Sequence, residues 1–162
     1  MSSAFAALIG QTQAIELLTC AVSQNRIAPA YLFAGASGVG RSLAARCFAE
    51  LLLMPVRASD RLAATNAPSA LRQRIQLGNH PDMLWVEPTY LHQGKRLSAT
   101  EAAELGVKRR SPPEIRLEQV REIARFLSRP PLEAGRSVVV LENAETMAEA
   151  AANGLLKTLE EP

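Results

Sequence analysis

Apolar residues at helical spacing run through much of the chain. Residues 11–25 place alanine, leucine and valine at positions i, i+3, i+4, i+7 and i+8, which line up on one face of a helix. Composition and spacing predict a second helix over 42–53 and a charged amphipathic helix over 115–127. Two further helices are expected, one near 68–77 and a final one over 147–160. The amphipathic segments each present an apolar face that a core must cover.

Three short apolar runs predict buried strands instead. Residues 30–34 lie directly before a glycine-rich turn, and residues 83–86 lie between two prolines. Residues 137–141 include three consecutive valines, whose branched side chains suit a pleated backbone. Because these runs are apolar throughout, they are typical of parallel strands that helices cover on both faces. The alternation of strands and helices therefore predicts an α/β fold of three layers with a mainly parallel sheet.

The last predicted helix carries a start signal of its own. Thr146 is followed three residues later by Glu149. A threonine hydroxyl and a glutamate carboxylate at this spacing can each accept a hydrogen bond from the other residue's backbone N–H, which forms a capping box. The sequence therefore predicts such a box at the start of the final helix.

Composition and charge narrow the class of protein. The 162 residues suit one domain, or one compact domain with the start of a second. The 48% of apolar and 21% of charged residues exclude disorder as the main state, and 9 glycines, 10 prolines and 2 cysteines exclude collagen, coiled coils and disulfide scaffolds. No apolar run approaches the roughly 18 residues that cross a membrane, and the first residues lack the regions of a signal peptide. Cys20 and Cys47 fit a reducing compartment and small core residues better than a disulfide. We therefore expect a cytoplasmic protein without a membrane partner.

Basic residues gather in the segment 88–113. Its cations are Lys95, Arg96, Lys108, Arg109 and Arg110. Two interpretations stay open, a solvated surface loop and a flexible arm near nucleic acid or an acidic partner surface. Aromatic residues make up only 4% of the chain and do not interleave with these cations, so base stacking has no support. With a net charge of only +2, a plain DNA-binding module is the weakest interpretation of the whole chain.

A glycine-rich turn follows the first predicted strand and precedes the second predicted helix. It matches the phosphate-loop pattern GxxxxGK[ST] at all positions but one, since arginine stands where lysine is expected. In such a loop the glycines let backbone N–H groups turn inward around an anion, and the positive end of the next helix adds to the attraction. The predicted phosphate-binding residues are Gly35, Ala36, Ser37, Gly38, Val39, Gly40, Arg41 and Ser42.

Two of these residues decide what such a site can do. The Ser42 hydroxyl is placed to ligate Mg²⁺ that nucleotide phosphates also hold. Arg41 keeps a positive charge, but its broad planar guanidinium does not match a cradle shaped for a lysine ammonium. We therefore expect weak binding of ATP with Mg²⁺ and poor placement of the γ-phosphate.

The valine strand ends on Glu142 and Asn143. Phosphate-loop ATPases end a later strand with an aspartate that holds Mg²⁺, and AAA+ proteins usually follow it with a glutamate that polarises water. Here Glu142 stands at the metal position, and Asn143 stands at the position of the base with an amide that cannot take up a proton. The sequence therefore predicts a degenerate site without catalytic residues. A plain polar strand end stays open as the alternative for Glu142.

The end of the chain carries the most specific pattern. Residues 150–162, AAANGLLKTLEEP, closely resemble the AAxNALLKTLEEP signature of bacterial clamp-loader subunits, with Gly154 at the usual alanine position. Further blocks similar to this AAA+ family are residues 8–11, 30–35, 78–82 and 115–128. Within the family, the His-Pro-Asp element, the altered loop and the Glu-Asn strand end resemble the delta-prime subunits of DNA polymerase III. The arginine variant and the long segment 88–113 are similar to the cyanobacterial branch.

This resemblance implies a fold and a function. Residues 1–162 would be the N-terminal portion of an AAA+ phosphate-loop domain, with 88–113 inserted in it and the lid and collar domains absent. The chain would work beside the tau/gamma and delta subunits in the DNA polymerase III holoenzyme, which load the sliding clamp onto primer-template DNA. Its own ATPase activity would be weak or absent. The rival from another class is an active phosphate-loop ATPase or a small-molecule kinase.

The chain departs from this family where zinc is concerned. The family commonly carries a module of four cysteines after the phosphate-loop helix, but residues 48–114 contain no cysteine. His80 and His92 lack partners at ligand spacing. We therefore expect no zinc and no other metal site made by protein ligands alone. Trp85, inside a predicted strand, is interpreted as a core residue.

Overall fold

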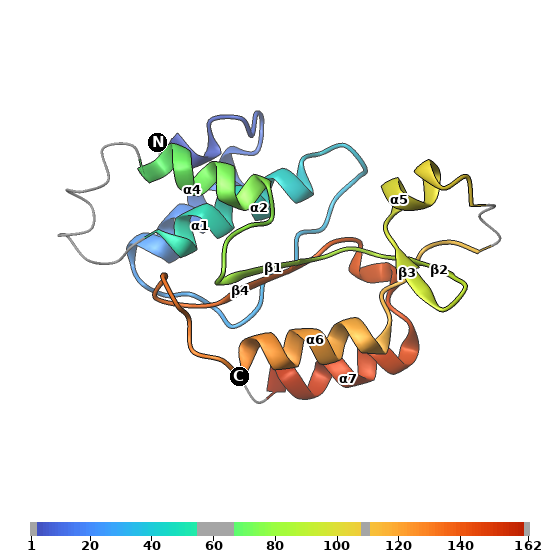
Figure 1. Cartoon of the computed structure of the whole chain (residues 1–162). Helices are drawn as coiled ribbons and strands as arrows, with labels where there is room; N and C mark the ends of the chain where they lie inside the picture. Colours follow the sequence, from blue (N-terminus) through green and yellow to red (C-terminus); the bar gives the residue numbers. More distant parts are fainter. Residues whose placement is uncertain (1–2, 55–66, 108–110, 161–162) are drawn as a thin grey trace. The chain divides into compact units, whose positions relative to one another are not determined.

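The computed structural model of the chain describes residues 3–54, 67–107 and 111–160. The chain divides into two units, each of which is described by itself. Unit 1 comprises Met1–Leu84 and Pro130–Val138, and unit 2 comprises Trp85–Arg129 and Val139–Pro162. Helices and short strands occur together along the chain, which is therefore a mixed α/β protein (Figure 1).

Helices dominate the described part of unit 1. Its elements are η1 (Ser3–Phe5), α1 (Thr12–Ser23), α2 (Arg41–Leu53) and α4 (Ala67–Gln76). The three α-helices begin and end within two residues of the predicted bounds. The predicted positions of these three helices are therefore confirmed.

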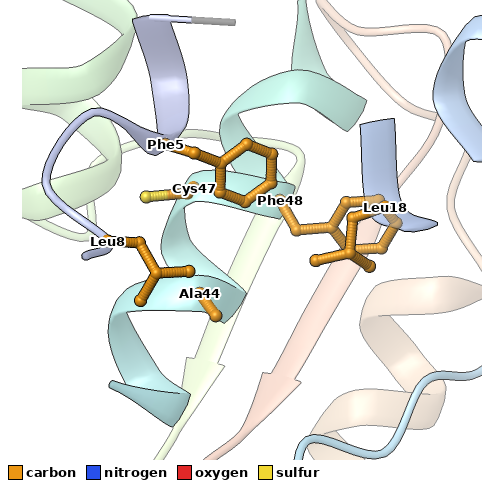
Figure 2. Packing of buried hydrophobic residues seen from close by; sticks show 6 residues of the cluster. All are labelled: Phe5, Leu8, Leu18, Ala44, Cys47 and Phe48. Carbon is orange, nitrogen blue, oxygen red and sulfur yellow. The ribbon is translucent and has the colours of Figure 1, made fainter. Parts of the chain in front are cut away.

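The core of unit 1 lies where the N-terminal segment and α1 meet α2. Its buried cluster consists of Phe5, Leu8, Leu18, Ala44, Cys47 and Phe48 (Figure 2). Ala44, Cys47 and Phe48 stand at i, i+3 and i+4, so one face of α2 enters this core. Cys47 is the small core residue that the sequence predicts, whereas Cys20 is exposed, and both are free thiols. Burial of a leucine or phenylalanine side chain contributes about 1.5–3 kcal/mol, so the cluster anchors α2 firmly.

A parallel pair of strands follows the predicted pattern. The pair is formed by β1 (Met83–Val86) and β4 (Val138–Leu141). The Val138 N–H donates to the Asp82 carbonyl at 2.9 Å, and the Glu142 N–H donates to the Val86 carbonyl at 2.8 Å. Both strands advance by four residues between these two bonds, so they run in the same direction. Two of the three predicted strands are therefore confirmed in position to within one residue.

A hairpin and three α-helices make up most of the described part of unit 2. Its elements are β2 (Tyr90–His92), β3 (Lys95–Leu97), α5 (Ala99–Glu104), α6 (Leu117–Leu127), η2 (Ala144–Thr146) and α7 (Glu149–Glu160). Strands β2 and β3 pair antiparallel, with Tyr90 opposite Leu97 and His92 opposite Lys95. Helices α6 and α7 end where the sequence predicts and begin two residues later.

Helices α6 and α7 pack side by side (Figure 1). Ala151 of α7 is fully buried, and the side chains of Val120 and Ile123 on α6 are at most 2% exposed. A Cβ atom built on Gly154 would lie 3.0 Å from Leu117 Cδ1. Small residues on α7 therefore meet larger side chains on α6, which lets the two helices approach closely.

The segment 30–34 is not a strand, contrary to the sequence prediction. It belongs to no strand in the described part of the chain, and Leu32 is 87% exposed. Its two rings pack on α2 instead, with ring centroids 4.8 Å apart for Tyr31 and Phe48 and 6.4 Å apart for Phe33 and Phe48. A short apolar run indicates that side chains will be covered, but it does not show whether a neighbouring strand will pair with the backbone.

The capping box predicted for Thr146 and Glu149 is also wrong. Helix α7 begins at Glu149, and Thr146 ends the preceding 3₁₀ turn. The Thr146 hydroxyl donates to the Asn143 carbonyl at 2.8 Å, and the Thr146 N–H donates to the same carbonyl at 2.9 Å. The hydroxyl therefore closes the turn before the helix, because a local backbone acceptor competes with the capping role.

Candidate functional site

Residues 35–42 lie in unit 1, where a glycine-rich turn over residues 35–40 leads directly into the first two residues of α2. Gly35, Gly38 and Gly40 have φ values of 155°, 82° and 98°, a range that favours glycine. Residues 35–39 are exposed, and residues 40–42 are half-buried. The eight predicted phosphate-binding residues therefore form one solvent-facing segment at the start of a helix.

Gly40 ends the turn and begins the helix. Its carbonyl accepts a hydrogen bond from the Ala44 N–H at 2.8 Å, while the Val39 N–H donates to the Ala36 carbonyl at 3.3 Å. A Cβ atom on Gly40 would lie 2.8 Å from Leu8 Cδ1, so a side chain here would displace a core residue. Gly40 has no side chain to cap α2, so an oxyanion in the turn would be attracted by the first backbone N–H groups and the helix dipole.

Arg41 and Ser42 occupy the first two positions of α2 and are half-buried. Both therefore stand where the helix meets the turn, which is the placement that a phosphate loop requires. None of the eight residues carries a carboxylate or an imidazole, so the turn itself supplies no general base. The chemistry that this geometry supports is electrostatic attraction of a phosphate group.

Glu142 and Asn143, which the sequence analysis assigns to the same site as this turn, lie in unit 2. Glu142 is half-buried, and its Oε2 accepts a hydrogen bond from Trp85 Nε1 at 3.0 Å. Asn143 is exposed and has φ 50° and ψ 53°, a left-handed conformation that asparagine tolerates better than glutamate does. Glu142 is therefore more than a solvated polar strand end, because its carboxylate joins β4 to β1.

The Glu142 carboxylate is engaged through one of its two oxygens, which accepts the hydrogen bond from the Trp85 ring N–H. A carboxylate has acceptor sites on both oxygens, so this bond by itself neither makes nor excludes a metal ligand. Within the described residues, no group of three or more His, Cys, Asp or Glu side chains lies together so as to hold a metal ion. The lack of a zinc site stays a prediction.

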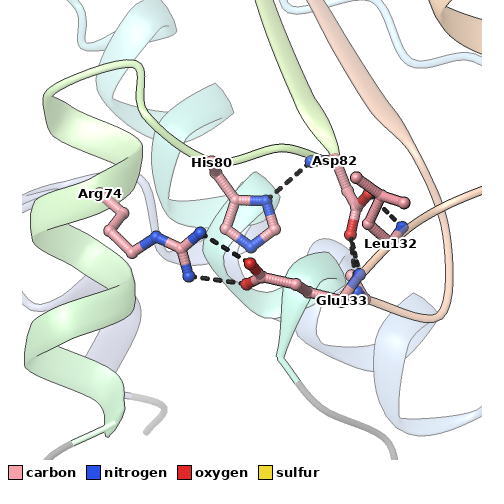
Figure 3. Close-up of polar contacts among 6 residues, drawn as sticks. Arg74, His80, Asp82, Leu132 and Glu133 are labelled. Carbon is pink, nitrogen blue, oxygen red and sulfur yellow. Dashed lines mark hydrogen bonds and ion pairs between the residues drawn. The ribbon is translucent and has the colours of Figure 1, made fainter.

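Asp82 is a buried residue whose role the sequence analysis missed. Its side chain accepts backbone hydrogen bonds from Leu132 at 2.6 Å and from Glu133 and Ala134 at 2.7 Å (Figure 3). Burial by itself raises the pKa of Asp82, but the N–H groups of Ala134, Leu132 and Glu133 outweigh it, so the pKa lies below its ordinary value. An aspartate between a proline and a buried strand is the signal that could have indicated such an anchor.

His80 belongs to the same cluster. The imidazole is 5% exposed, and its Nδ1 accepts a hydrogen bond from the Asp82 N–H at 3.1 Å. Burial, followed by the nearby Arg74 charge, lowers the pKa of His80. Arg74 forms two hydrogen bonds with Glu133, at 2.7 and 3.0 Å (Figure 3). The hydrogen bonds of this cluster therefore hold residues 132–134, which precede β4, against residues 80–82, which precede β1.

The basic segment 88–113 is partly folded into regular structure. Its described residues form the β2–β3 hairpin and α5, and its neck is closed by paired hydrogen bonds between Thr89 and Glu114 at 3.0 and 3.2 Å. Arg96 pairs with Glu122 of α6. The cations at 108–110 lie outside the described residues. Both interpretations of the segment, a solvated surface loop and a flexible arm near nucleic acid or an acidic partner surface, stay predictions.

Residues 35–42 follow the phosphate-loop pattern at all positions but one, and an acid follows the parallel strand β4. The family model described as DNA polymerase III, delta subunit, matches residues 10–162. The chain belongs to this family.

Relatives with known names agree with that assignment. A DNA polymerase III subunit delta' from Pseudomonas aeruginosa is 37% identical over 137 residues, which cover 83% of this chain and 34% of the relative. A subunit delta' from Bacillus subtilis is 28% identical over 153 residues, which cover 94% and 38%. A tau/gamma subunit from Haemophilus influenzae is 28% identical over 160 residues, which cover 98% and 19%. No solved structure gives a significant match.

The comparisons confirm the predicted resemblance to delta-prime subunits. The chain spans about a third of the length of the delta' relatives that it matches. Its similarity to the cyanobacterial branch stays a prediction. Among the described residues, no helix has the length and apolar character needed to cross a membrane.

Proposed function

We propose that this chain is the N-terminal AAA+ portion of a clamp-loader subunit. It would work in the DNA polymerase III holoenzyme with tau/gamma and delta subunits, which place the sliding clamp on primer-template DNA in the cytoplasm. The family match over residues 10–162 and the subunit delta' relatives support this function. The parallel β1–β4 pair supports a three-layer phosphate-loop fold with a mainly parallel sheet. Zinc has no part in the proposal.

The observation that carries the proposed mechanism is the strand end at Glu142 and Asn143. An amide at the position of the water-polarising acid cannot accept a proton. The acid before it is hydrogen-bonded to Trp85. Residues 35–42 would then hold a phosphate group weakly without splitting it. The chain would therefore be a structural member of the loader and not its motor.

The ATPase rate tests this mechanism. Loss of the base and of the lysine point charge each cost a few kcal/mol of barrier, so turnover should fall by about 10² or more for each loss. We expect no steady-state hydrolysis by the chain, alone or mixed with tau/gamma and delta subunits, beyond that of the partners. The control is Ser42→Ala, which should leave the measured rate unchanged. Turnover that disappears in Ser42→Ala would support an active ATPase or a small-molecule kinase instead.

Partner capture tests the assignment to the loader. Chemical cross-linking of the purified chain with tau/gamma and delta subunits should yield cross-linked pairs with at least one of them. The same reaction with an unrelated phosphate-loop protein is the control. A chain that cross-links to neither subunit would contradict the proposed assembly.

Contact with primer-template DNA has its own support in unit 2. Arg121 and Arg125 lie one turn apart on α6, and Arg129 follows the end of this helix. All three are exposed, and no ion pair joins them to other described residues. Exposed arginines near one another neutralise phosphates without fixed geometry. They form a second candidate contact for DNA, beside the basic segment 88–113.

A further inference from the structure

The root of the β2–β3 hairpin is fastened to α6 by a buried amide. Gln119 of α6 is 5% exposed, and its Nε2 donates to the Glu87 carbonyl at 2.9 Å while its Oε1 accepts from the Thr89 hydroxyl at 3.2 Å. Thr89 and Glu114 also exchange backbone hydrogen bonds at this root. A buried amide with its donor and its acceptor both engaged holds the segment before the hairpin in one position. The side chains of β3 therefore reach α6 at a defined place.

Arg96 of β3 pairs with Glu122 of α6 at that place. Its Nη2 and Nη1 donate to the two carboxylate oxygens of Glu122 at 2.5 and 3.3 Å. The two side chains are 35% and 45% exposed, so the pair adds little to stability by itself. Its main consequence is electrostatic, because both oxygens of Glu122 are engaged by one cation.

Glu122 is the acid that lies beside the exposed arginines of α6. Arg125 follows it by three residues, so the two side chains are neighbours on the helix surface, and a glutamate at this spacing pairs with the arginine that follows it. In the described part of the chain, however, no ion pair joins Arg121 or Arg125 to another residue. With Glu122 engaged by the hairpin, Glu118 is the remaining exposed acid of α6.

We propose that Arg96 is a positioning residue, which keeps Glu122 away from the arginines of α6 and leaves these arginines to the phosphates of DNA. The inference rests on the proposed function for the DNA contact in unit 2, and it names a residue on which that contact depends. Phosphates fit this surface because Arg121, Arg125 and Arg129 outnumber the one remaining acid. The hairpin thus contributes to DNA binding through Glu122, without contact between Arg96 and DNA.

Four proteins test the role of Arg96 by their affinity for primer-template DNA at low salt. Arg96→Gln should weaken binding by about three- to fivefold, because Glu122 then pairs with Arg125 and repels phosphates. Glu122→Gln should not weaken binding. The double variant Arg96→Gln/Glu122→Gln should bind as the wild type does, since the acid is removed together with its partner.

Two outcomes would overturn the inference. If Arg96 contacted DNA itself, the double variant would bind as weakly as Arg96→Gln. If the pair had no influence on the arginines, Arg96→Gln would bind like the wild type.

The matched control is Arg74→Gln in unit 1. Arg74 and Glu133 form a pair of the same kind, with two hydrogen bonds and side chains that are 41% and 50% exposed. The variant loses the same charge and leaves an acid unpaired, but on elements without a proposed DNA contact. Its affinity for DNA should equal that of the wild type, and a loss as large as that of Arg96→Gln would reduce the effect to net charge and overturn the inference.

The NMR signal of the Arg125 Nε–H group gives a measurement without DNA. It should move in Arg96→Gln, where Glu122 is released, and return in the double variant. A wild type that does not bind DNA, but shows this movement in Arg96→Gln, would contradict the proposed DNA contact and leave the pairing role of Arg96 intact. A chain that binds DNA, but whose Arg125 signal and affinity are the same in Arg96→Gln, would contradict the inference and leave the DNA contact intact.

Discussion

Asp82 is a single buried side chain that binds three consecutive backbone groups of a segment about 50 residues further along the chain. A carboxylate that accepts several N–H groups is stabilised in its charged form, which offsets the cost of its burial. The side chain is 2% exposed. Asp82 thus supplies the hydrogen-bond acceptors for three consecutive backbone N–H groups of the segment before β4.

Replacement of Asp82 by asparagine should destabilise the protein by about 2–4 kcal/mol. The NH₂ group of the asparagine amide would face backbone N–H groups, and two donors cannot form a hydrogen bond with each other. Urea unfolding followed by circular dichroism measures the change. The matched control is Glu16→Gln, an exposed carboxylate on α1, which should change the free energy of unfolding by less than about 0.5 kcal/mol. Equal stability of the two variants would contradict the anchoring role.

His80 should make stability depend on pH in the neutral range. Its pKa in the folded chain lies below the ordinary value of 6.5, so near and below that pH the unfolded chain binds the proton more readily. The free energy of unfolding should therefore fall as the pH drops through 6. Below about pH 4.5 it should fall again, because the pKa values of Glu133 and Asp82 are lowered in the folded chain.

Two histidine variants isolate the first of these effects. His80→Asn keeps an acceptor for the Asp82 N–H but does not titrate near neutral pH, so the slope between about pH 7 and pH 5 should be reduced. His92 is exposed, and His92→Asn should keep the slope. Urea midpoints across this pH range measure both. An unchanged slope in His80→Asn would show that another group carries the dependence.

Among the elements, α6 and α7 approach each other closely at Gly154. A Cβ atom there would lie 3.0 Å from Leu117 Cδ1 and 3.5 Å from Val120 Cγ1. The first of these is the far end of a flexible side chain, which can move by a few tenths of an ångström. The contact therefore admits one methyl group and little more.

The effect of a substitution at Gly154 on stability should depend on the size of the new side chain. Gly154→Ala should stabilise the chain by up to about 1 kcal/mol, because alanine favours the helix more than glycine does. Gly154→Val should destabilise it by about 1–3 kcal/mol through overpacking against α6. Thermal unfolding measures both, and Asn153→Val at the exposed neighbouring position controls for β-branching alone. A valine tolerated equally at both positions would contradict the close contact.

For the chain taken as a whole, the proposed contact with DNA can be tested at the cations of unit 2. Arg121→Gln and Arg125→Gln should each weaken binding to primer-template DNA and reduce the slope of affinity against salt by about one unit. Arg26→Gln, at an exposed arginine in unit 1, is the control. Fluorescence anisotropy at two ionic strengths measures these effects. Replacement of Lys108, Arg109 and Arg110 by serine tests the basic segment in the same assay.

Five helices, two strands and the local form of the glycine-rich turn could be predicted from the sequence, whereas α5 and the β2–β3 hairpin were missed. These features depend on interactions within a few residues, such as the spacing of apolar side chains or the positive φ that Gly40 adopts. The family signature also belongs to the sequence alone, since the match extends over residues 10–162.

Only the tertiary structure decided which distant groups meet. Segment 30–34 packs its rings on Phe48 of α2 instead of pairing as a strand. Asp82 reaches Leu132 and the two residues after it, and Trp85 reaches Glu142 across 57 positions of sequence. A periodic pattern records which side chains avoid water, but hydrogen-bond partners are chosen by the packing that brings two segments together. For that reason the sequence located the acid at the end of β4, whereas the fold determined what the acid binds.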